Sequence, residues 1–331
     1  MTEFDPMVSV IIPTYNYAHW IGEAIDSVLN SNFSEGKIEI IVVDNGSTDD
    51  TSARIETYKD RIKYIAQENC GKAWATKIGI DNAKGKYLFN LDADDLFLPN
   101  KIKEVISVFE KDKSIVHVAH PAICWNVSNN TKTIESIPKI VKGRKIFGKD
   151  LLSYFYRRNM LFGGGSTFAV RSEIPKRIFI PKEADMLIDE YLLLLTLGHG
   201  HTFFIDQPLS IWRIHGKNFS NMISKANIDK NKMQRNVSGM KAVFSALLEG
   251  DFEEDIKKLY LLKIKVLETA MKEYEGQKSF WDIMDLWKYL LANLRIFGLD
   301  IFRIIKNYTI LNRTLPTSLL KMLKQTKQPK N

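Results

Sequence analysis

The amino-acid sequence predicts an α/β protein with a mostly parallel sheet, helices on both faces and a C-terminal helical extension. Three observations lead to this fold class. Short β-branched runs alternate with helical patterns between residues 8 and 99, which is typical of parallel strands joined by short connections. Charged residues interrupt every long apolar stretch, so no membrane-spanning helix is expected. From about residue 221, helical periodicity replaces the alternation.

The first strand and the first helix are expected within residues 8–30. "VSVIIPTYN" (8–16) is a β-branched run that meets a proline, which is typical of a buried strand entering a loop. In the next segment, 19–30, apolar residues recur at helical spacing. These residues are Ile21, Ala24, Ile25, Val28 and Leu29.

Two further strand–helix pairs and a fourth strand follow. The second strand is expected at 38–43, where the Asn-Gly pair at 45–46 suits a turn and the hydroxyl residues after it can cap a helix. A third strand is expected at 61–67, a helix at 71–84 and a fourth strand at 86–92. The order β-α-β-α-β-α-β predicts that the carboxyl ends of these strands share one rim of the sheet.

Composition is that of an ordinary soluble globular protein. The chain has 331 residues, of which 45% are hydrophobic and 26% charged, with a formal net charge of +8. The positive charge favours an anionic partner. Cys70 and Cys124 lie far apart in the sequence and imply neither a disulfide framework nor a zinc site. With no signal-peptide pattern at the N-terminus, a cytoplasmic location is expected.

The strongest chemical signal is a group of carboxylates directly after the fourth expected strand. In "KYLFNLDADDLFLP" an apolar run ends on Asp92, Asp94 and Asp95. Like charges this close repel one another, and folding alone does not require them. Grouped carboxylates at a strand end form a hard-oxygen site for Mg²⁺ or Mn²⁺, and such an ion usually also binds substrate phosphates. The alternative is a turn before a helix, which accounts for Asp95 as an N-cap but not for the other two.

The sequence also limits how a phosphate group can be held. Neither GxxxxGKS/T nor a GxGxxG after the first strand occurs, which excludes the two common glycine-rich phosphate loops. "FGGGS" (162–166) is glycine-rich but lies far from the first strand. Phosphates are therefore expected to rest on a metal ion at the rim of the sheet.

Several motifs in a fixed order resemble family 2 glycosyltransferases of the GT-A fold. They are "VSVIIPTYN", "IIVVDNGSTDD" and "ENCGKAWATKIGIDNAKGKYLFNLDADD". The resemblance is strong over 8–99 and continues with gaps to about residue 220. It implies transfer of a sugar from a nucleotide diphosphate sugar to the hydroxyl of a carbohydrate or lipid-linked acceptor, in polysaccharide or glycolipid synthesis.

The resemblance implies donor-binding roles for residues at the strand ends. Pro13, Thr14 and Tyr15 match the loop that lies against the base and ribose, and Asp44 matches the aspartate that accepts a hydrogen bond from the base, typically uracil. Lys77 lies next to the position where the family often has an arginine, and it is the candidate for that charge.

Asp92 and Asp94 match the family's D-x-D pair. The resemblance implies that Asp92 faces the ribose or the metal. It also implies that Asp94 is the principal ligand of a divalent cation, Mn²⁺ or Mg²⁺.

The catalytic base is expected at Asp189-Glu190, where the family commonly has Glu-Asp. Matching by position selects Glu190, and matching by residue type selects Asp189. The two side chains lie about 100° apart on a helix, so only one is expected to reach the site. We expect Glu190, with Asp189 as the alternative. The alternative is that both acids lie in the first turn of a helix, where they stabilise the helix dipole and have no catalytic role.

Arg213 and His215 resemble the family's Arg-x-His and share one face of an expected strand. The resemblance implies that His215 binds the metal or the diphosphate, and that Arg213 pairs with phosphate or acceptor. A structural role for both is the alternative. With one base and one displacement, the family's reaction inverts the anomeric carbon.

The C-terminal region is expected to be helical. One long helix is expected to carry an apolar stripe of Ile283, Leu286, Trp287, Leu290, Leu291 and Leu294. The division expected is a catalytic domain at 1–220, with a donor half at about 1–100 and an acceptor half at about 101–220, and a helical region at 221–331. This helical region either caps the catalytic domain or makes peripheral contact with the inner face of an anionic plasma membrane.

Three rival interpretations remain open. A non-enzymatic nucleotide or nucleic-acid binder would carry basic residues interleaved with aromatics along one element, whereas the expected site is acidic. A metal-dependent nucleotidyltransferase would need a glycine-rich phosphate loop after the first strand. A catalytically inactive relative is the third, because Asn45, Thr76 and the order Asp189-Glu190 depart from the family pattern.

Overall fold

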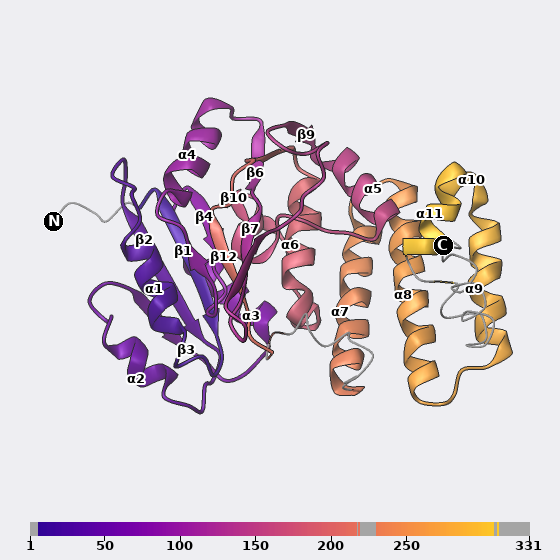
Figure 1. The fold of residues 1–331 in the computed structure, drawn as a ribbon, viewed down its shortest axis with the longest axis horizontal. Helices are drawn as coiled ribbons and strands as arrows, with labels where there is room; N and C mark the ends of the chain where they lie inside the picture. The colour runs from indigo at the N-terminus through magenta and orange to yellow at the C-terminus, as the bar shows by residue number, and fades with distance from the viewer. Residues whose placement is uncertain (1–5, 217, 219–229, 308–309, 311–331) are drawn as a thin grey trace, which may run out of the picture. The chain divides into compact units, whose positions relative to one another are not determined.

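The computed structural model describes residues 6–216, 218, 230–307 and 310 (Figure 1). The chain divides into two compact units. The first holds the described residues of Met1–Leu151 and Phe162–Asp229, and the second those of Leu152–Leu161 and Lys230–Asn331. The predicted boundary at residue 220 lies outside the described residues, so the division into 1–220 and 221–331 stays a prediction.

A large mixed sheet forms the centre of the first unit. Its strand order is β3-β2-β1-β4-β10-β6-β11-β9. The four strands predicted from the sequence form its first half and pair in parallel, and β10 runs antiparallel between β4 and β6. The strands are β1 Val8–Thr14, β2 Ile38–Asp44, β3 Lys63–Ala66, β4 Tyr87–Asn90, β6 Ile115–Ala119, β9 Lys145–Phe147, β10 Ala169–Arg171 and β11 His201–Phe204. The predicted fold class is confirmed.

Alternation along β1 explains why helices cover both faces of this sheet. Val8, Val10 and Ile12 point into a core shared with α1 and α4. Ile11 points to the other face, where α3 approaches so closely that a Cβ on Gly79 would lie 2.3 Å from its Cγ2. The helices of this unit are α1 Ile21–Leu29, α2 Thr51–Glu56, α3 Lys72–Asn82, α4 Lys101–Lys111, the start of α5 Gly148–Arg158, and α6 Ile188–Leu197. Three short 3₁₀ turns are η1 Gly165–Thr167, η2 Pro175–Arg177 and η3 Lys182–Leu187.

A second, smaller sheet has the order β5-β12-β7-β8. Its strands are β5 Leu96–Phe97, β7 Ala122–Asn126, β8 Thr131–Ile134 and β12 Ser210–Ile214. β12 pairs with β5 through Ser210↔Phe97 and Ile211↔Leu96. Because β5 directly follows the loop after β4, this pairing brings the C-terminal end of β12 to the carboxylates of that loop.

The second unit is helical, as expected. Its helices are the end of α5, α7 Lys230–Glu249, α8 Glu254–Tyr274, α9 Phe280–Ala292, α10 Leu294–Phe297, η5 Gly298–Asp300 and α11 Ile301–Asn307. The hydroxyl of Ser279 accepts from the backbone of Asp282 and begins α9 with a capping box. Among the helices that the structure describes, none is both long and apolar enough to cross a bilayer.

The prediction of one long helix with a continuous apolar stripe is wrong. The helix α9 ends at Ala292 with Asn293 as its C-cap, and the chain turns again at Gly298, whose φ of +53° favours glycine. Leu286 and Leu290 are buried as predicted, but Leu291, on the same predicted stripe, is 62% exposed.

Candidate active site

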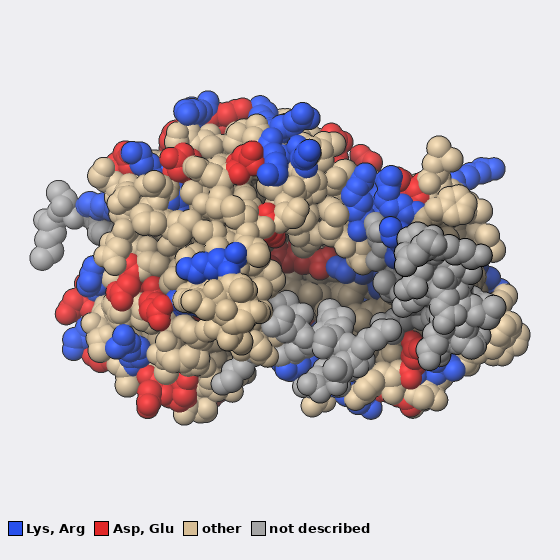
Figure 2. All heavy atoms as spheres, in the orientation of Figure 1, with Lys and Arg blue, Asp and Glu red and all other residues tan. Residues whose placement is uncertain are grey.

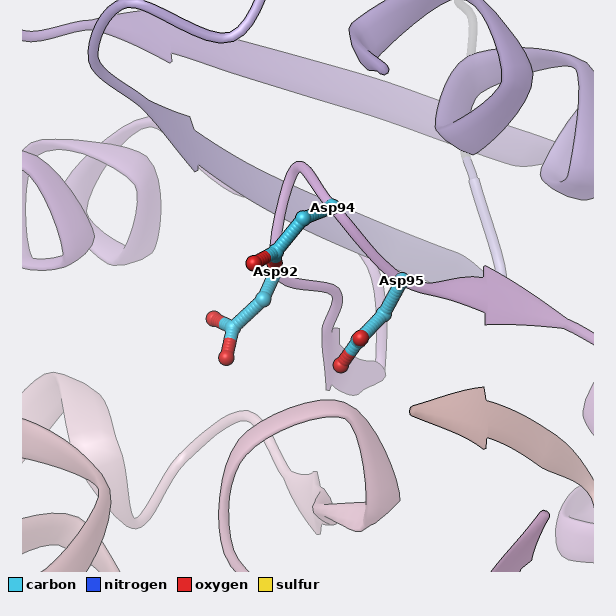
Figure 3. A group of neighbouring side chains, drawn as sticks. All are labelled: Asp92, Asp94 and Asp95. Carbon is cyan, nitrogen blue, oxygen red and sulfur yellow. The ribbon is translucent and has the colours of Figure 1, made fainter. Parts of the chain in front are cut away.

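The loop after β4 gathers three carboxylates. One oxygen from each of Asp92, Asp94 and Asp95 lies within 4.8 Å of the others. Asp92 and Asp95 extend to the same side of the loop (Figure 3). Strand β4 is fully buried and ends at Asn90, so the apolar run fixes the strand and delivers the carboxylates to its end. The expected grouping of these side chains is therefore present.

Asp95 holds the site together. It is 3% exposed. One carboxylate oxygen accepts from the Ser166 hydroxyl at 2.6 Å, and the other accepts from the backbone N–H of Arg213 at 3.0 Å. Burial, reinforced by the charges of Asp94 and Asp92, raises the pKa of Asp95 well above its ordinary value. Asp95 thus joins the loop to η1 and β12.

Asp94 faces His215. His215 Nε2 lies 2.9 Å from Asp94 Oδ2, and Asn218 Nδ2 lies 3.4 Å from the same oxygen. The His215 ring stacks on the Trp20 ring at 6.0 Å. Burial and the charge of Asp94 raise the pKa of Tyr17, so that phenol stays protonated. Because a carboxylate can only accept, His215 Nε2 donates here. Ligation of a metal by this nitrogen would require that hydrogen bond to break.

Lys72 connects Asp92 to Asp189. Its Nζ lies 2.9 Å from Asp92 Oδ1 and 2.9 Å from Asp189 Oδ2. Burial alone would lower the pKa of Lys72, but Asp189 and Asp92 raise it. Burial raises the pKa of Asp92 to about 6, against the opposing effect of Lys72. The sequence analysis missed Lys72, although its position, directly after Gly71 at the start of a helix on the site rim, was a usable signal.

Of the two candidate bases, the structure brings Asp189 to the carboxylate loop. Both residues lie in the first turn of α6. Asp189 reaches Asp92 through Lys72, whereas Glu190 is 7% exposed and lies one helical step away. This geometry favours Asp189 over the expected Glu190.

The glycine run at 163–165 shapes the space beside Asp189. Gly163 has φ +90°, and a Cβ there would lie 2.7 Å from the Ala119 side chain. A Cβ on Gly165 would lie 3.5 Å from Asp92 Oδ2 and 3.6 Å from Asp189 Oδ2. A side chain at Gly165 would therefore contact the carboxylates of both Asp92 and Asp189.

A fully buried lysine, Lys101, connects η1 to β12 next to the carboxylate loop. Lys101 is 0% exposed, and its Nζ donates to the Ser166 carbonyl at 2.5 Å and to the Ser210 hydroxyl at 3.1 Å. It also lies 3.5 Å from the centre of the Phe97 ring. Burial lowers the pKa of Lys101 well below its ordinary value. No local pattern in the sequence distinguishes this lysine from its exposed neighbours.

The predicted donor-side residues lie at the ends of β1 and β2. Pro13 and Thr14 are buried, and Tyr15 is 43% exposed. Asp44 accepts from the Ser47 backbone at 2.9 Å and from the Tyr64 hydroxyl at 3.1 Å. Within the described part of the chain, the buried Thr14 hydroxyl has no hydrogen-bond partner.

Two of the predicted donor contacts are not supported by the geometry. Lys77 Nζ binds Asp81 at 2.5 Å, because five residues along α3 turn it about 140° away from Lys72. The Arg213 guanidinium is 0% exposed, pairs with Glu23 and lies 4.4 Å from the centre of the Trp20 ring. It packs inside the unit instead of presenting a cation at the site rim.

Charged side chains of both signs are interspersed on the face drawn in Figure 2. Over the described residues on that face, Lys and Arg side chains lie among Asp and Glu side chains. A nucleic-acid-binding face typically gathers its basic residues into a patch or stripe. The nucleic-acid interpretation therefore gains no support from this face.

Comparison with known sequences identifies the class of protein. Residues 9–179 match the family model described as Glycosyl transferase family 2. An uncharacterized glycosyltransferase from Nostoc sp. is 30% identical over 291 residues, which cover 85% of this chain and 86% of that one. The chain therefore belongs to the family 2 glycosyltransferases. This assignment removes the support for the nucleotidyltransferase alternative.

Comparison with solved structures identifies the fold as GT-A. Residues 1–349 of TarS from S. aureus, solved in complex with UDP-GlcNAc, superpose with a TM-score of 0.63 at 16% identity, covering 98% of this chain and 93% of that one. A mannosyltransferase from Pyrobaculum calidifontis, in complex with GDP-Man and Mn²⁺, gives 0.50 at 18% identity, covering 94% and 88%.

Proposed function

We propose that this chain transfers a sugar from a UDP-sugar to an acceptor hydroxyl, with inversion, using a divalent cation held by Asp92 and Asp94. The acceptor class proposed is a carbohydrate or lipid-linked saccharide in polysaccharide or glycolipid synthesis. One observation carries the proposal: Lys72 Nζ lies 2.9 Å from both Asp92 and Asp189, so a candidate base stands beside the candidate metal loop.

The donor assignment draws on the neighbouring structures and on the ends of β1 and β2. TarS was solved with UDP-GlcNAc, and the mannosyltransferase was solved with GDP-Man. The choice of uridine here rests on Asp44, whose carboxylate has lone pairs beyond the two that Ser47 and Tyr64 use.

The carboxylate loop fits a hard divalent cation. Its oxygens lie within 4.8 Å of one another, and Mg²⁺ and Mn²⁺ prefer oxygen ligands. Asp92 and Asp94 would supply the ligands, because Asp95 is 3% exposed and its carboxylate joins the loop to η1 and β12. When bound, such an ion neutralises charge that grows on the leaving diphosphate.

Asp189 is the residue we propose as the base, in place of Glu190. A carboxylate there can accept the proton of the acceptor hydroxyl as that oxygen attacks the anomeric carbon. Lys72 joins Asp189 to Asp92, which supports a reacting sugar bound with its leaving group toward the carboxylate loop and its acceptor toward Asp189. Attack from the face opposite the diphosphate gives inversion.

Ligand-dependent thermal stability tests the donor assignment. We expect UDP and one UDP-sugar to raise the melting temperature with Mn²⁺ present and to have a much smaller effect with EDTA, because a ligand that binds only the folded state stabilises it. Asp94→Asn should remove the Mn²⁺-dependent part of the shift. A panel of nucleotide diphosphates and their sugars that gives no shift would favour the inactive relative instead.

We also propose that the second unit contacts an anionic membrane. Leu299, Phe302 and Trp281 are 99%, 80% and 71% exposed on its C-terminal helices. Beyond Asp300 the sequence carries lysines and arginines but no acidic residue, and such a combination attracts anionic lipid. We expect the chain to float with vesicles containing phosphatidylglycerol, and Phe302→Ser to weaken this. Equal recovery with neutral vesicles would contradict the proposal.

A further inference from the structure

We propose that Lys72 is an internal counter-ion, whose ammonium neutralises the carboxylates of Asp92 and Asp189 when no ligand is bound. We further propose that this ammonium couples binding of the divalent cation to binding of the donor. This inference rests on the proposed function for its metal and its base. It concerns what the chain does before either ligand arrives.

The contact geometry makes Lys72 a shared partner for the two carboxylates. Its Nζ donates to Asp92 and Asp189, each at 2.9 Å, and only 17% of its side chain is exposed. The two aspartates come from elements far apart in sequence, the loop after β4 and the first turn of α6. Their charges repel, so an ammonium between them stabilises the ligand-free arrangement.

A divalent cation on Asp92 competes with this ammonium. The cation and the Lys72 ammonium would then bind the same carboxylate. Two positive charges that close repel each other strongly in a buried site, where little water screens them. Binding of the cation alone is therefore opposed by Lys72. A nucleotide diphosphate brings negative charge to the same place and relieves the repulsion, so that both positive charges can remain.

Two consequences follow. Lys72 lowers the affinity for the free cation, and it makes the cation and the diphosphate bind more tightly together than apart. Because such coupling is reciprocal, each ligand should raise the affinity for the other by the same factor. A lysine that only packed between helices would affect stability without affecting this factor.

Calorimetric titration of Mn²⁺ tests the proposal without any turnover. Wild type, Lys72→Met, Lys72→Arg and the matched control Lys77→Met, which removes a lysine of the same helix that pairs with Asp81, are each titrated with and without UDP. Lys72→Met should bind Mn²⁺ alone at least about tenfold more tightly than wild type. It should also lose most of the gain in Mn²⁺ affinity that UDP produces. Lys72→Arg keeps the charge and should resemble wild type, as should Lys77→Met.

Unchanged or weaker binding of Mn²⁺ alone by Lys72→Met would overturn the counter-ion proposal. Lys72→Gln, which is also neutral but can still donate a hydrogen bond, provides the same comparison if the Met variant does not fold. The titration also separates this failure from a failure of the proposed function. In the latter case wild type would bind no Mn²⁺ with or without UDP, and Asp94→Asn would not differ from it.

Discussion

Asp94→Asn is expected to lower metal-dependent turnover of the donor by at least about 10³-fold while the protein stays folded. Asn has the same shape as Asp, and its carbonyl oxygen can still accept from His215. What it lacks is the negative charge that a divalent cation requires at this position. Turnover of a UDP-sugar at saturating Mn²⁺, together with circular dichroism, measures both parts of this expectation.

The same variant should be more stable than wild type in the absence of metal. Burial raises the pKa of Asp92 to about 6, and the charges of Asp189 and Asp94 add to this effect. An acid whose pKa is higher in the folded state makes the protein less stable as pH rises from its unfolded pKa to its folded one. The stabilisation by Asp94→Asn should therefore be largest above about pH 6, where Asp92 is charged.

The exposed Asp60 provides a matched control for this prediction. Asp60→Asn removes the same charge from the surface of the first unit and should change neither turnover nor the melting temperature appreciably. Normal turnover in a folded Asp94→Asn protein would contradict the assignment of the metal loop.

Asp189→Asn is expected to lower the rate of sugar transfer by about 10²- to 10⁴-fold, because removal of a general base slows the chemical step. The variant should still bind the UDP-sugar, because no donor contact is removed. The comparison variant is Glu190→Gln, one residue further along α6 and 7% exposed. It should keep most of its transfer activity. Transfer rates at saturating donor and acceptor, with donor affinity measured separately, decide between them. Loss of transfer in Glu190→Gln with retention in Asp189→Asn would restore the expectation from the sequence.

The donor half of the fold could be predicted from the sequence because its signals are local. β1 and β2 are β-branched runs that are buried over most of their length. A short run of this kind between turn residues predicts a buried strand without any knowledge of the rest of the chain. The carboxylate loop could also be predicted, because three aspartates within four positions repel one another and a turn before a helix accounts for only one of them. The parallel pairing of these strands then followed from the short connections between them.

The rest depended on contacts between segments far apart in the sequence. Lys72 and Asp189 are separated in sequence by more than half the length of the first unit. No periodicity in the sequence predicts that one ammonium joins Asp189 to Asp92. The prediction that Arg213 and His215 share one strand face is wrong, because β12 ends at Ile214, although both side chains lie against the Trp20 ring. The burial of Arg213 against Trp20, however, depends on how α1 packs, and no sequence motif predicts that packing.

The most direct test of the central claim is release of UDP from a panel of UDP-sugars, measured with Mn²⁺, with EDTA and with the Asp94→Asn variant. Our account predicts that wild type releases UDP from one of these sugars in the presence of Mn²⁺, that EDTA abolishes the release, and that an acceptor saccharide accelerates it. Release that is equal with Mn²⁺ and EDTA, or unchanged in Asp94→Asn, would contradict a metal-dependent transferase centred on Asp92, Asp94 and Asp189.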